Sequence, residues 1–325
     1  MSNVRCVFVV PGPLERLSGG NLYDRVAIDA LRARGWEVEV VEPGQHASEA
    51  DVVVVDSLAF PYGPPDVDAP LVAVAHQLPS KAAQRPEWAA AERDVLLASR
   101  LVVTVADWLR DELAKLTDSW IEVVTPGRDL AAAPDGPAPD ADLVLSVGNA
   151  VPGKGMPEAV EAFLRADLQG ATLAVAGDLG WDRAETERLR AAAALDPGRV
   201  RLLGPIDPED LAGLYRGARV FLTASTYEGW PIAVAEAMAS GLAVIGYSGP
   251  GIGEVVGTEG LLVRAGDPGE LARFLAILWN DPYLARGLGE KGRGRAQRWP
   301  TWAETGERFA DLLEREVGAT SGRQV

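Results

Sequence analysis

Residues 220–246 read VFLTASTYEGWPIAVAEAMASGLAVIG, and this stretch indicates the fold. Residues 220–223 and 243–246 are short apolar runs typical of buried strands, and residues 232–240 between them form a helical pattern without Gly or Pro. Pro231 suits the first position of that helix. A strand, a helix and a second strand in this order are typical of a parallel sheet covered by helices.

The same alternation continues along the whole chain. In the first half we expect strands at 4–10, 36–42, 51–56, 71–75, 101–105 and 121–124, and helices at 20–34, 86–98 and 107–116. In the second half we expect strands at 143–147, 173–176, 200–203, 220–223, 243–246 and 261–263, and helices at 156–166, 182–194, 208–216, 232–240, 268–279 and 282–298. We therefore predict an α/β protein with two Rossmann-like domains, each a doubly wound parallel sheet.

A proline-rich segment divides the two series. Residues 134–140 read PDGPAPD, a composition typical of an interdomain linker. We expect an amino-terminal domain over 1–133 and a carboxyl-terminal domain over 141–299. An amphipathic helix is expected at 300–317, followed by a disordered polar tail at 318–325.

Length and charge narrow the functional classes. The 325 residues suit two domains that each bury a core. A net charge of −16 removes the electrostatic driving force for binding nucleic acids or anionic membrane surfaces. No uninterrupted apolar run approaches a membrane span, and Cys6 is the single cysteine. We expect a cytoplasmic protein that associates with neither nucleic acid nor membrane, and no feature indicates an oligomeric state.

Ligands of doubly wound sheets bind outside the carboxyl ends of the strands, and two such domains would face each other across a central cleft. Glu228 precedes the helix at 232–240 and Glu236 lies within it, so both carboxylates can accept hydrogen bonds from the hydroxyls of one ligand. Free N–H groups at the start of this helix favour an anion or sugar hydroxyls. The loop 248–254, SGPGIGE, permits close backbone approach, and the loop 147–155, VGNAVPGKG, presents Lys154 to a diphosphate.

These residues resemble the retaining glycosyltransferases of family four, which have the GT-B fold. The resemblance rests on the two glutamates in Glu-x7-Glu spacing, on the EAMASG run at 236–241, and on the two glycine loops ending in Glu254 and surrounding Lys154. In the first half, SGGN at 18–21 and LRARGWEV at 31–38 look like the family's glycine loop, first helix and second strand. The helix at 300–317 resembles one that crosses back onto the amino-terminal domain.

The resemblance implies a role for each matched position. Glu236 matches the glutamate that binds both ribose hydroxyls, Glu228 the glutamate near the transferred sugar, and Lys154 a lysine that binds the diphosphate. His76 matches a histidine adjacent to the donor sugar, and with Glu228 and Lys154 it forms the expected catalytic set. The other expected donor-binding residues are Gly19, Gly20, Asn149, Gly229, Trp230, Pro231, Ile232, Gly251, Ile252, Gly253 and Glu254.

Two features bear on cations. Asn149 stands where the family usually has an arginine, so one of two positive charges on the diphosphate is missing. Acidic pairs at 66 and 68 and at 140 and 142 superficially suggest a metal site, but both precede strands, whereas a metal site would follow one. We expect no bound metal and no cofactor.

The implied activity is metal-independent, retaining transfer of a sugar from a nucleoside-diphosphate sugar to a small soluble acceptor. The amino-terminal domain would hold the acceptor and the other domain the nucleotide. The acidic amino-terminal half favours a neutral or cationic acceptor over a membrane phospholipid. Two alternatives stay open: a sugar-nucleotide epimerase of the same fold, and a catalytically weak nucleotide-binding pseudoenzyme, for which Asn149 is the motive.

Overall fold

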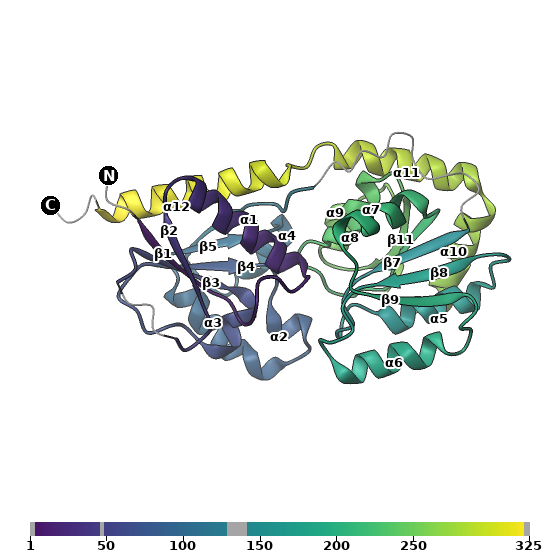
Figure 1. Cartoon of the computed structure of the whole chain (residues 1–325), viewed down its shortest axis with the longest axis horizontal. Helices are drawn as coiled ribbons and strands as arrows, with labels where there is room; N and C mark the ends of the chain where they lie inside the picture. Colours follow the sequence, from purple (N-terminus) through teal and green to yellow (C-terminus); the bar gives the residue numbers. More distant parts are fainter. Residues whose placement is uncertain (1–3, 46–48, 129–141, 322–325) are drawn as a thin grey trace. The chain divides into compact units, whose positions relative to one another are not determined.

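A computed structural model of the chain describes residues 4–45, 49–128 and 142–321. The chain forms two compact units, Met1–Gly127 with Pro300–Val325, and Arg128–Trp299 (Figure 1). The first unit ends at Gly127, earlier than the predicted boundary at 133. Arg128 is the first residue of the second unit, and its guanidinium donates hydrogen bonds to the carbonyls of Gln297 and Trp299 in that unit, at 3.0 and 3.2 Å. The predicted linker at 134–140 lies outside the described residues.

The first unit contains a six-stranded parallel sheet with the order β2-β1-β3-β4-β5-β6. Its elements are β1 (Arg5–Val9), α1 (Gly19–Ala33), β2 (Glu37–Val41), β3 (Val52–Asp56), the 3-10 helix η1 (Ser57–Tyr62), β4 (Leu71–Ala75), α2 (Pro79–Ala82), the 3-10 helix η2 (Pro86–Trp88), α3 (Ala89–Ala98), β5 (Leu101–Thr104), α4 (Asp107–Leu113), β6 (Trp120–Val123) and α12 (Trp302–Ser321). Every residue of β3, β4 and β5 is buried, as expected for parallel strands covered on both faces. The edge strand β6 has no buried residue.

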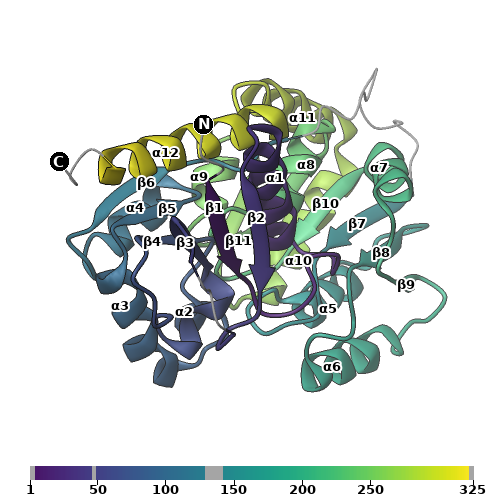
Figure 2. The same ribbon diagram turned by 60° about the vertical axis from the view of Figure 1, so that its left-hand side comes forward.

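Helix α12 returns to the first unit and packs along α1 (Figures 1 and 2). Gly306 permits close packing, because a Cβ atom there would lie 3.1 Å from side-chain atoms of Ala30 and Val26. Arg34 anchors the pair of helices through ion pairs with three acidic residues of α12, Glu307, Asp311 and Glu314. The helix runs to Ser321, so residues 318–321 are helical and not a disordered tail as predicted. No proline interrupts this segment, and residues 322–325 lie outside the described residues.

The second unit contains a six-stranded parallel sheet with the order β12-β11-β10-β7-β8-β9. Its elements are β7 (Leu143–Val147), α5 (Met156–Ala166), β8 (Thr172–Ala176), α6 (Arg183–Ala193), β9 (Val200–Gly204), α7 (Pro208–Gly217), β10 (Val220–Thr223), α8 (Ile232–Ala239), β11 (Ala243–Ser248), α9 (Ile252–Val256), β12 (Leu261–Arg264), α10 (Pro268–Asn280) and α11 (Pro282–Ala296). The predicted fold class, two Rossmann-like parallel-sheet domains, is confirmed.

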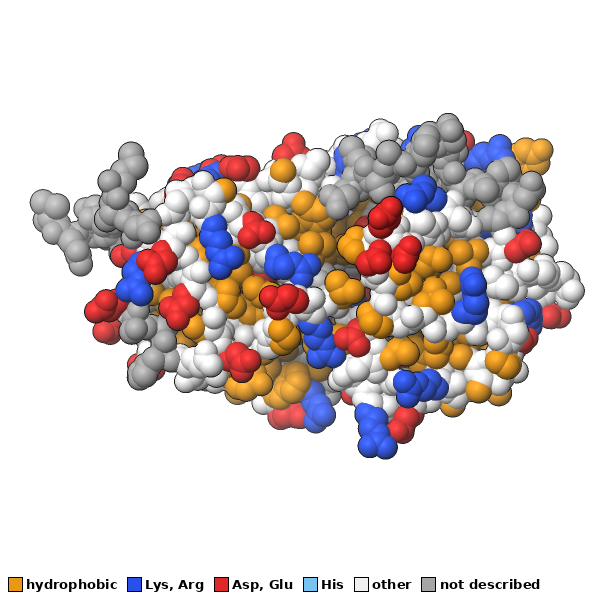
Figure 3. All heavy atoms as spheres, in the orientation of Figure 1, with side chains coloured by type: hydrophobic (Ala, Val, Ile, Leu, Met, Phe, Trp, Pro, Cys, Tyr) orange, Lys and Arg blue, Asp and Glu red, His pale blue; other side chains and the backbone are white. Residues whose placement is uncertain are grey.

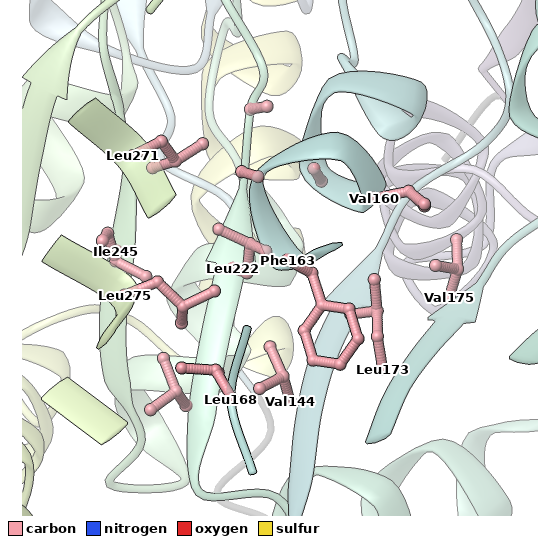
Figure 4. Packing of buried hydrophobic residues seen from close by; sticks show 14 of the residues in the cluster. Val144, Val160, Phe163, Leu168, Leu173, Val175, Leu222, Ile245, Leu271 and Leu275 are labelled. Atoms are coloured by element: carbon pink, nitrogen blue, oxygen red, sulfur yellow. The ribbon is translucent and has the colours of Figure 1, made fainter. Parts of the chain in front are cut away.

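Both faces of this second sheet are buried. Leu222 packs on one face with Phe163 of α5 and Leu275 of α10, in the cluster drawn in Figure 4. The adjacent Phe221 packs on the other face with Val234 and Met238 of α8. Neighbouring residues of a strand point to opposite faces, so a continuous apolar strand has helices on both sides.

Strand order creates one reversal point in each sheet. In the first sheet β1 lies between β2 and β3, and in the second sheet β7 lies between β8 and β10. The loops that follow the two strands beside such a point diverge, which leaves room for a ligand. The relevant loops therefore follow β1 and β3 in the first unit and β7 and β10 in the second.

The surface is mixed in charge. On the face drawn in Figure 3, Lys and Arg side chains are scattered among Asp and Glu side chains. None of the helices within the described ranges is long and apolar enough to cross a bilayer.

Candidate functional site

The reversal point of the second sheet holds an ion pair between Lys154 and Glu228. The ammonium of Lys154, in the loop after β7, donates to both carboxylate oxygens of Glu228, in the loop after β10, each at 2.7 Å. Glu228 is 8% exposed, whereas a third of the Lys154 side chain remains accessible. A lysine ammonium has three N–H donors, so one remains for a ligand after Glu228 has taken two.

Glycines bring the three loops of this site into contact. Gly155 has a positive φ of 64°, and a Cβ atom there would lie 2.1 Å from the carbonyl oxygen of Ala224. Gly153 accepts a backbone hydrogen bond from Thr226 at 2.9 Å, which joins the same two loops. Gly251, with φ of 76°, lies so close to Glu228 that a Cβ atom would be 2.2 Å from its carbonyl oxygen. The loop that carries Glu228 is therefore held from both sides.

Glu236 points to a different partner from Glu228. It is half-buried on α8 and accepts a hydrogen bond of 2.9 Å from the hydroxyl of Tyr215, at the end of α7. Burial, followed by the charge of Glu236 and its hydrogen bond, raises the pKa of Tyr215 well above its usual range. Tyr215 is thus a neutral donor that orients the carboxylate.

The residues between the two glutamates shape the start of α8. Gly229 is buried, and the half-buried Trp230 packs edge to face on Trp299 with 5.4 Å between ring centroids. Pro231 is the N-cap of α8 and not, as predicted, its first helical residue, because the helix begins at Ile232. The carbonyl of Pro231 accepts a hydrogen bond from the Ala235 amide.

The loop after β11 continues into α9, a short helix that the sequence pattern did not predict. Ile252 is buried, Gly253 is exposed, and Glu254 is half-buried. The guanidinium of Arg295 in α11 donates to the carbonyls of Glu254 and Val255, each at 2.7 Å. These hydrogen bonds hold the end of the glycine loop against α11.

Asn149 has a structural contact in the loop after β7. Its side-chain oxygen accepts a hydrogen bond of 3.0 Å from the backbone N–H of Asp178. An amide in this role ties the β7 loop to the β8 loop, and it brings no positive charge.

At the reversal point of the first sheet, His76 lies between two buried aspartates. Its Nε2 atom is 2.9 Å from Asp24 in α1 and 3.2 Å from Asp56 at the end of β3. Both carboxylate side chains are 1% exposed and the His76 side chain is 12% exposed. We call these three residues the Asp–His–Asp cluster.

The predicted glycine loop lies against this cluster. Gly19 is exposed and Gly20 is half-buried at the start of α1, where Ser18 caps the helix by accepting the Asn21 amide. A Cβ atom at Gly20 would lie 3.3 Å from the His76 ring. The structure thus brings Gly20 and His76 together, as it brings Lys154 and Glu228 together in the other unit.

Charge dominates the Asp–His–Asp cluster. Burial alone would lower the pKa of His76, but the charges and hydrogen bonds of Asp24 and Asp56 outweigh it and raise this pKa to about 10. Burial, and then the charge of Asp56, raises the pKa of Asp24 to about 6, although His76 opposes this change. At neutral pH these two pKa values favour the imidazolium form of His76 and the ionised form of Asp24.

Among the described residues, this cluster is the one group of His, Cys, Asp and Glu side chains close enough to hold one metal ion. The imidazole already bridges the two carboxylates, so the contacts are those of an ion-paired group. Asp66 and Asp68 are exposed, and residue 140 lies outside the described ranges.

Sequence reasoning missed Asp24, Asp56 and Tyr215. A signal existed for Asp24, because it occupies the same helical stripe as the buried Ala27, Ile28 and Leu31. An acid at such a core position requires a buried partner. Asp56 also had a signal, since it ends the apolar run VVVVD at the carboxyl end of a strand.

Comparison with known proteins gives a consistent picture. The family described as "Glycosyl transferases group 1" matches residues 129–295, more than half of the chain. D-inositol 3-phosphate glycosyltransferase 2 of Catenulispora acidiphila is 30% identical over 250 residues, covering 70% of this chain and 58% of that protein. Three of the curated relatives are matched over 29%, 58% and 33% of their own lengths.

Solved structures share the fold. Sucrose-phosphate synthase of Thermosynechococcus elongatus has a TM-score of 0.83 at 21% identity, with 98% of this chain and 100% of that chain covered. HepE of Anabaena, solved in complex with UDP-glucose, has a TM-score of 0.79 at 16% identity, with coverages of 96% and 100%. At these identities the likeness concerns the architecture alone.

Proposed function

This chain belongs to the group 1 glycosyl transferases, and from that premise we propose that it transfers a sugar from a nucleoside-diphosphate sugar to a small soluble acceptor. The observation that carries the proposal is the Lys154–Glu228 pair at the reversal point of the second sheet. A partly accessible cation beside a buried carboxylate suits a ligand that presents both phosphate oxygens and sugar hydroxyls.

The second unit would bind the donor. Glu236, oriented by Tyr215, would accept hydrogen bonds from the two ribose hydroxyls, and the remaining N–H of Lys154 would contact the diphosphate. Backbone amides of the glycine loop around Gly251 and of the start of α8 would add neutral donors. HepE is known in complex with UDP-glucose, which makes UDP-sugars the first donors to test.

The first unit would bind the acceptor, with Gly19 and Gly20 approaching the donor and His76 contacting the transferred sugar. The curated relative named for D-inositol 3-phosphate makes neutral polyols reasonable acceptors to test. A neutral or cationic acceptor suits the acidic chain better than an anionic lipid.

We propose retention through a front-face reaction without a metal. The acceptor hydroxyl oxygen bonds to the anomeric carbon on the face that the diphosphate leaves, and the bond from this carbon to the phosphate oxygen breaks. The departing phosphate oxygen takes the hydroxyl proton, so no protein base is required. Lys154 and backbone amides stabilise the charge that develops on the phosphate, the interaction expected to contribute most to catalysis.

Two experiments test the proposal. A thermal-shift panel of nucleotides and nucleotide sugars identifies the donor, because a ligand that binds only the folded state raises Tm. With that donor, Glu236→Ala should weaken binding in calorimetry, since the ribose hydroxyls lose their acceptor. Unchanged nucleotide affinity in Glu236→Ala would show that the donor site is wrongly assigned.

Product analysis separates the alternatives. Proton NMR of the product with each acceptor should show the donor's anomeric configuration, and activity should persist in EDTA. Conversion of the donor without any acceptor would indicate an epimerase. Tight nucleotide binding without turnover would indicate the pseudoenzyme for which the uncharged Asn149 is the motive.

A further inference from the structure

The Asp–His–Asp cluster has two buried carboxyl groups, one more than is needed to orient a histidine ring. One carboxylate is enough to orient an imidazole, yet here Asp24 and Asp56 both lie within 3.2 Å of the same nitrogen. Asp24 is 0% exposed, so water does not reach it, and its Oδ2 atom has no hydrogen-bond partner in the protein. Burying two carboxylates is costly unless a cation compensates them.

The available cation is the imidazole itself. Nε2 lies within hydrogen-bond distance of both carboxyl groups, and ionised carboxylates accept and do not donate, so Nε2 is the atom that carries the proton between them. A neutral imidazole would still leave two negative charges beside it, whereas an imidazolium leaves one. Arg25, whose charge favours the ionised form of Asp24, provides part of the remaining compensation.

The surroundings hold the ring in one orientation. The rings of Tyr23 and His76 pack edge to face with 4.9 Å between ring centroids, and a Cβ atom at Gly20 would lie 3.3 Å from Cδ2 of the imidazole. The backbone N–H of His76 donates to the hydroxyl of Ser57 at 3.2 Å, next to Asp56. The imidazole, 12% exposed, is the most accessible member of the cluster, so a ligand would meet the ring and not the acids.

We propose that Asp24 and Asp56 are positioning residues that fix His76 through Nε2 and keep it an imidazolium, so that it meets substrate as a cation and hydrogen-bond donor and not as a general base. Protonation also leaves a proton on Nδ1, so the group that this ring contacts must be an acceptor: a sugar hydroxyl oxygen or a phosphate oxygen. The link to the transferred sugar rests on the proposed function, whereas the charge of His76 does not.

The raised pKa of His76, about 10, agrees with the geometry. Charged and titratable groups near the ring are Asp24, Tyr23 and Arg25 of α1 and Asp56 of β3, with Arg308 of α12 acting on Tyr23. A histidine that stays protonated at pH 8 cannot remove a proton from the acceptor, which agrees with a reaction in which the leaving phosphate does so.

NMR of the imidazole protons tests the proposal directly, because the chain has only two histidines and His46→Gln leaves His76 alone. In the full-length His46→Gln protein, His76 should stay protonated from pH 6 to pH 9. Adding Asp24→Asn should lower its pKa by at least about one unit, because an attraction to the imidazolium is lost. The matched control is Asp66→Asn, at an exposed position, which should leave the pKa of His76 unchanged.

A pH profile gives the second readout. From one pH unit below to one pH unit above the variant's measured His76 pKa, the protonated share falls from about nine-tenths to about one-tenth, so kcat/KM should fall about tenfold across that interval. The parent should show no such loss, and a purely structural role for Asp24 would lower activity equally at all pH values. If Asp24→Asn does not fold, the parent titration decides alone.

Two results would overturn the proposal. One is a parent His76 that titrates near its ordinary value of about 6.5. The other is a shift of the His76 resonances when Zn²⁺ is added to EDTA-treated protein, since the cluster would then hold a metal in place of the proton. Absence of transferase activity with His76 still protonated would count against the proposed function only.

Discussion

The hydroxyl of Tyr215 donates a hydrogen bond to the carboxylate of Glu236, with 2.9 Å between the two oxygens. Tyr215 is 4% exposed, and its hydroxyl also lies 3.2 Å from the carbonyl oxygen of Ala233. The contact joins the last turn of α7 to the middle of α8, the two helices that flank β10 in the chain. A buried donor thus determines where the candidate ribose-binding carboxylate points.

We predict that Tyr215→Phe weakens nucleotide binding without removing the site. The variant keeps the buried ring and loses only the donor to Glu236, a hydrogen bond worth about 1 kcal/mol. The Kd of the nucleotide should rise roughly three- to tenfold in calorimetry, less than in Glu236→Ala, with little change in kcat. Tyr283→Phe is the matched control, because Tyr283 is 83% exposed. Equal losses in both variants would dismiss a specific role for Tyr215.

The Lys154–Glu228 pair leads to a prediction about both stability and donor binding. Lys154→Met leaves the carboxylate of Glu228, 8% exposed, without its cation, so the free energy of unfolding should fall by about 1–3 kcal/mol. The binding free energy of the donor should fall by more than the free energy of unfolding, because the diphosphate loses its charge-assisted contact with Lys154. Urea unfolding and calorimetry measure the two effects separately.

Two variants serve as controls for this pair. Lys115→Met removes an exposed ion pair with Glu112 and should cost less than about 1 kcal/mol. Lys154→Met with Glu228→Gln removes both charges, and its loss of stability should be smaller than the sum of the single losses. Strictly additive losses would mean that the two side chains do not interact in solution.

Two glycines at the start of α9, Gly251 and Gly253, should respond oppositely to alanine. At Gly251, φ is 76° and a Cβ atom would lie 2.2 Å from the Glu228 carbonyl oxygen, so Gly251→Ala should cost about 3 kcal/mol or more. At Gly253, inside α9, a Cβ atom meets nothing within 4 Å, so Gly253→Ala should be neutral or stabilise by up to about 1 kcal/mol. Thermal unfolding of both variants gives the comparison, and similar Tm losses would contradict it.

The sequence predicts the large elements well because each has a strong local cause. Strands such as Leu71–Ala75 are apolar throughout, as strands covered on both faces must be. Helices α7, α10 and α11 each begin with an aspartate cap followed by proline, at Asp207, Asp267 and Asp281. The elements η1, α2 and α9 are too short for a periodic pattern, and all three were missed.

Some residues of the candidate site have a local signal in the sequence, and others come together only through the strand order. Lys154 and Glu228 stand in loops whose glycines are visible in the sequence. Asp24 and His76 are 52 positions apart, and only the strand order places the start of α1 beside the ends of β3 and β4. Tyr215 looks like one more apolar residue of α7. Partners that meet through topology cannot be identified from local spacing, even when each residue has a local reason to be buried.

Cys6 gives a final prediction, about the first unit. It is 1% exposed within β1, and burial raises the pKa of its thiol to about 12. At pH 8 only about one thiol in ten thousand would be ionised, and the thiolate is the reactive form. Cys6 should therefore resist a disulfide reagent such as DTNB in the native protein and react fully in concentrated urea. With no other cysteine in the chain, the slow native reaction measures opening of the first sheet. Tyr62→Cys, at a position 70% exposed, supplies the fast reference, and a native Cys6 that reacted as fast would show that β1 is not buried in solution.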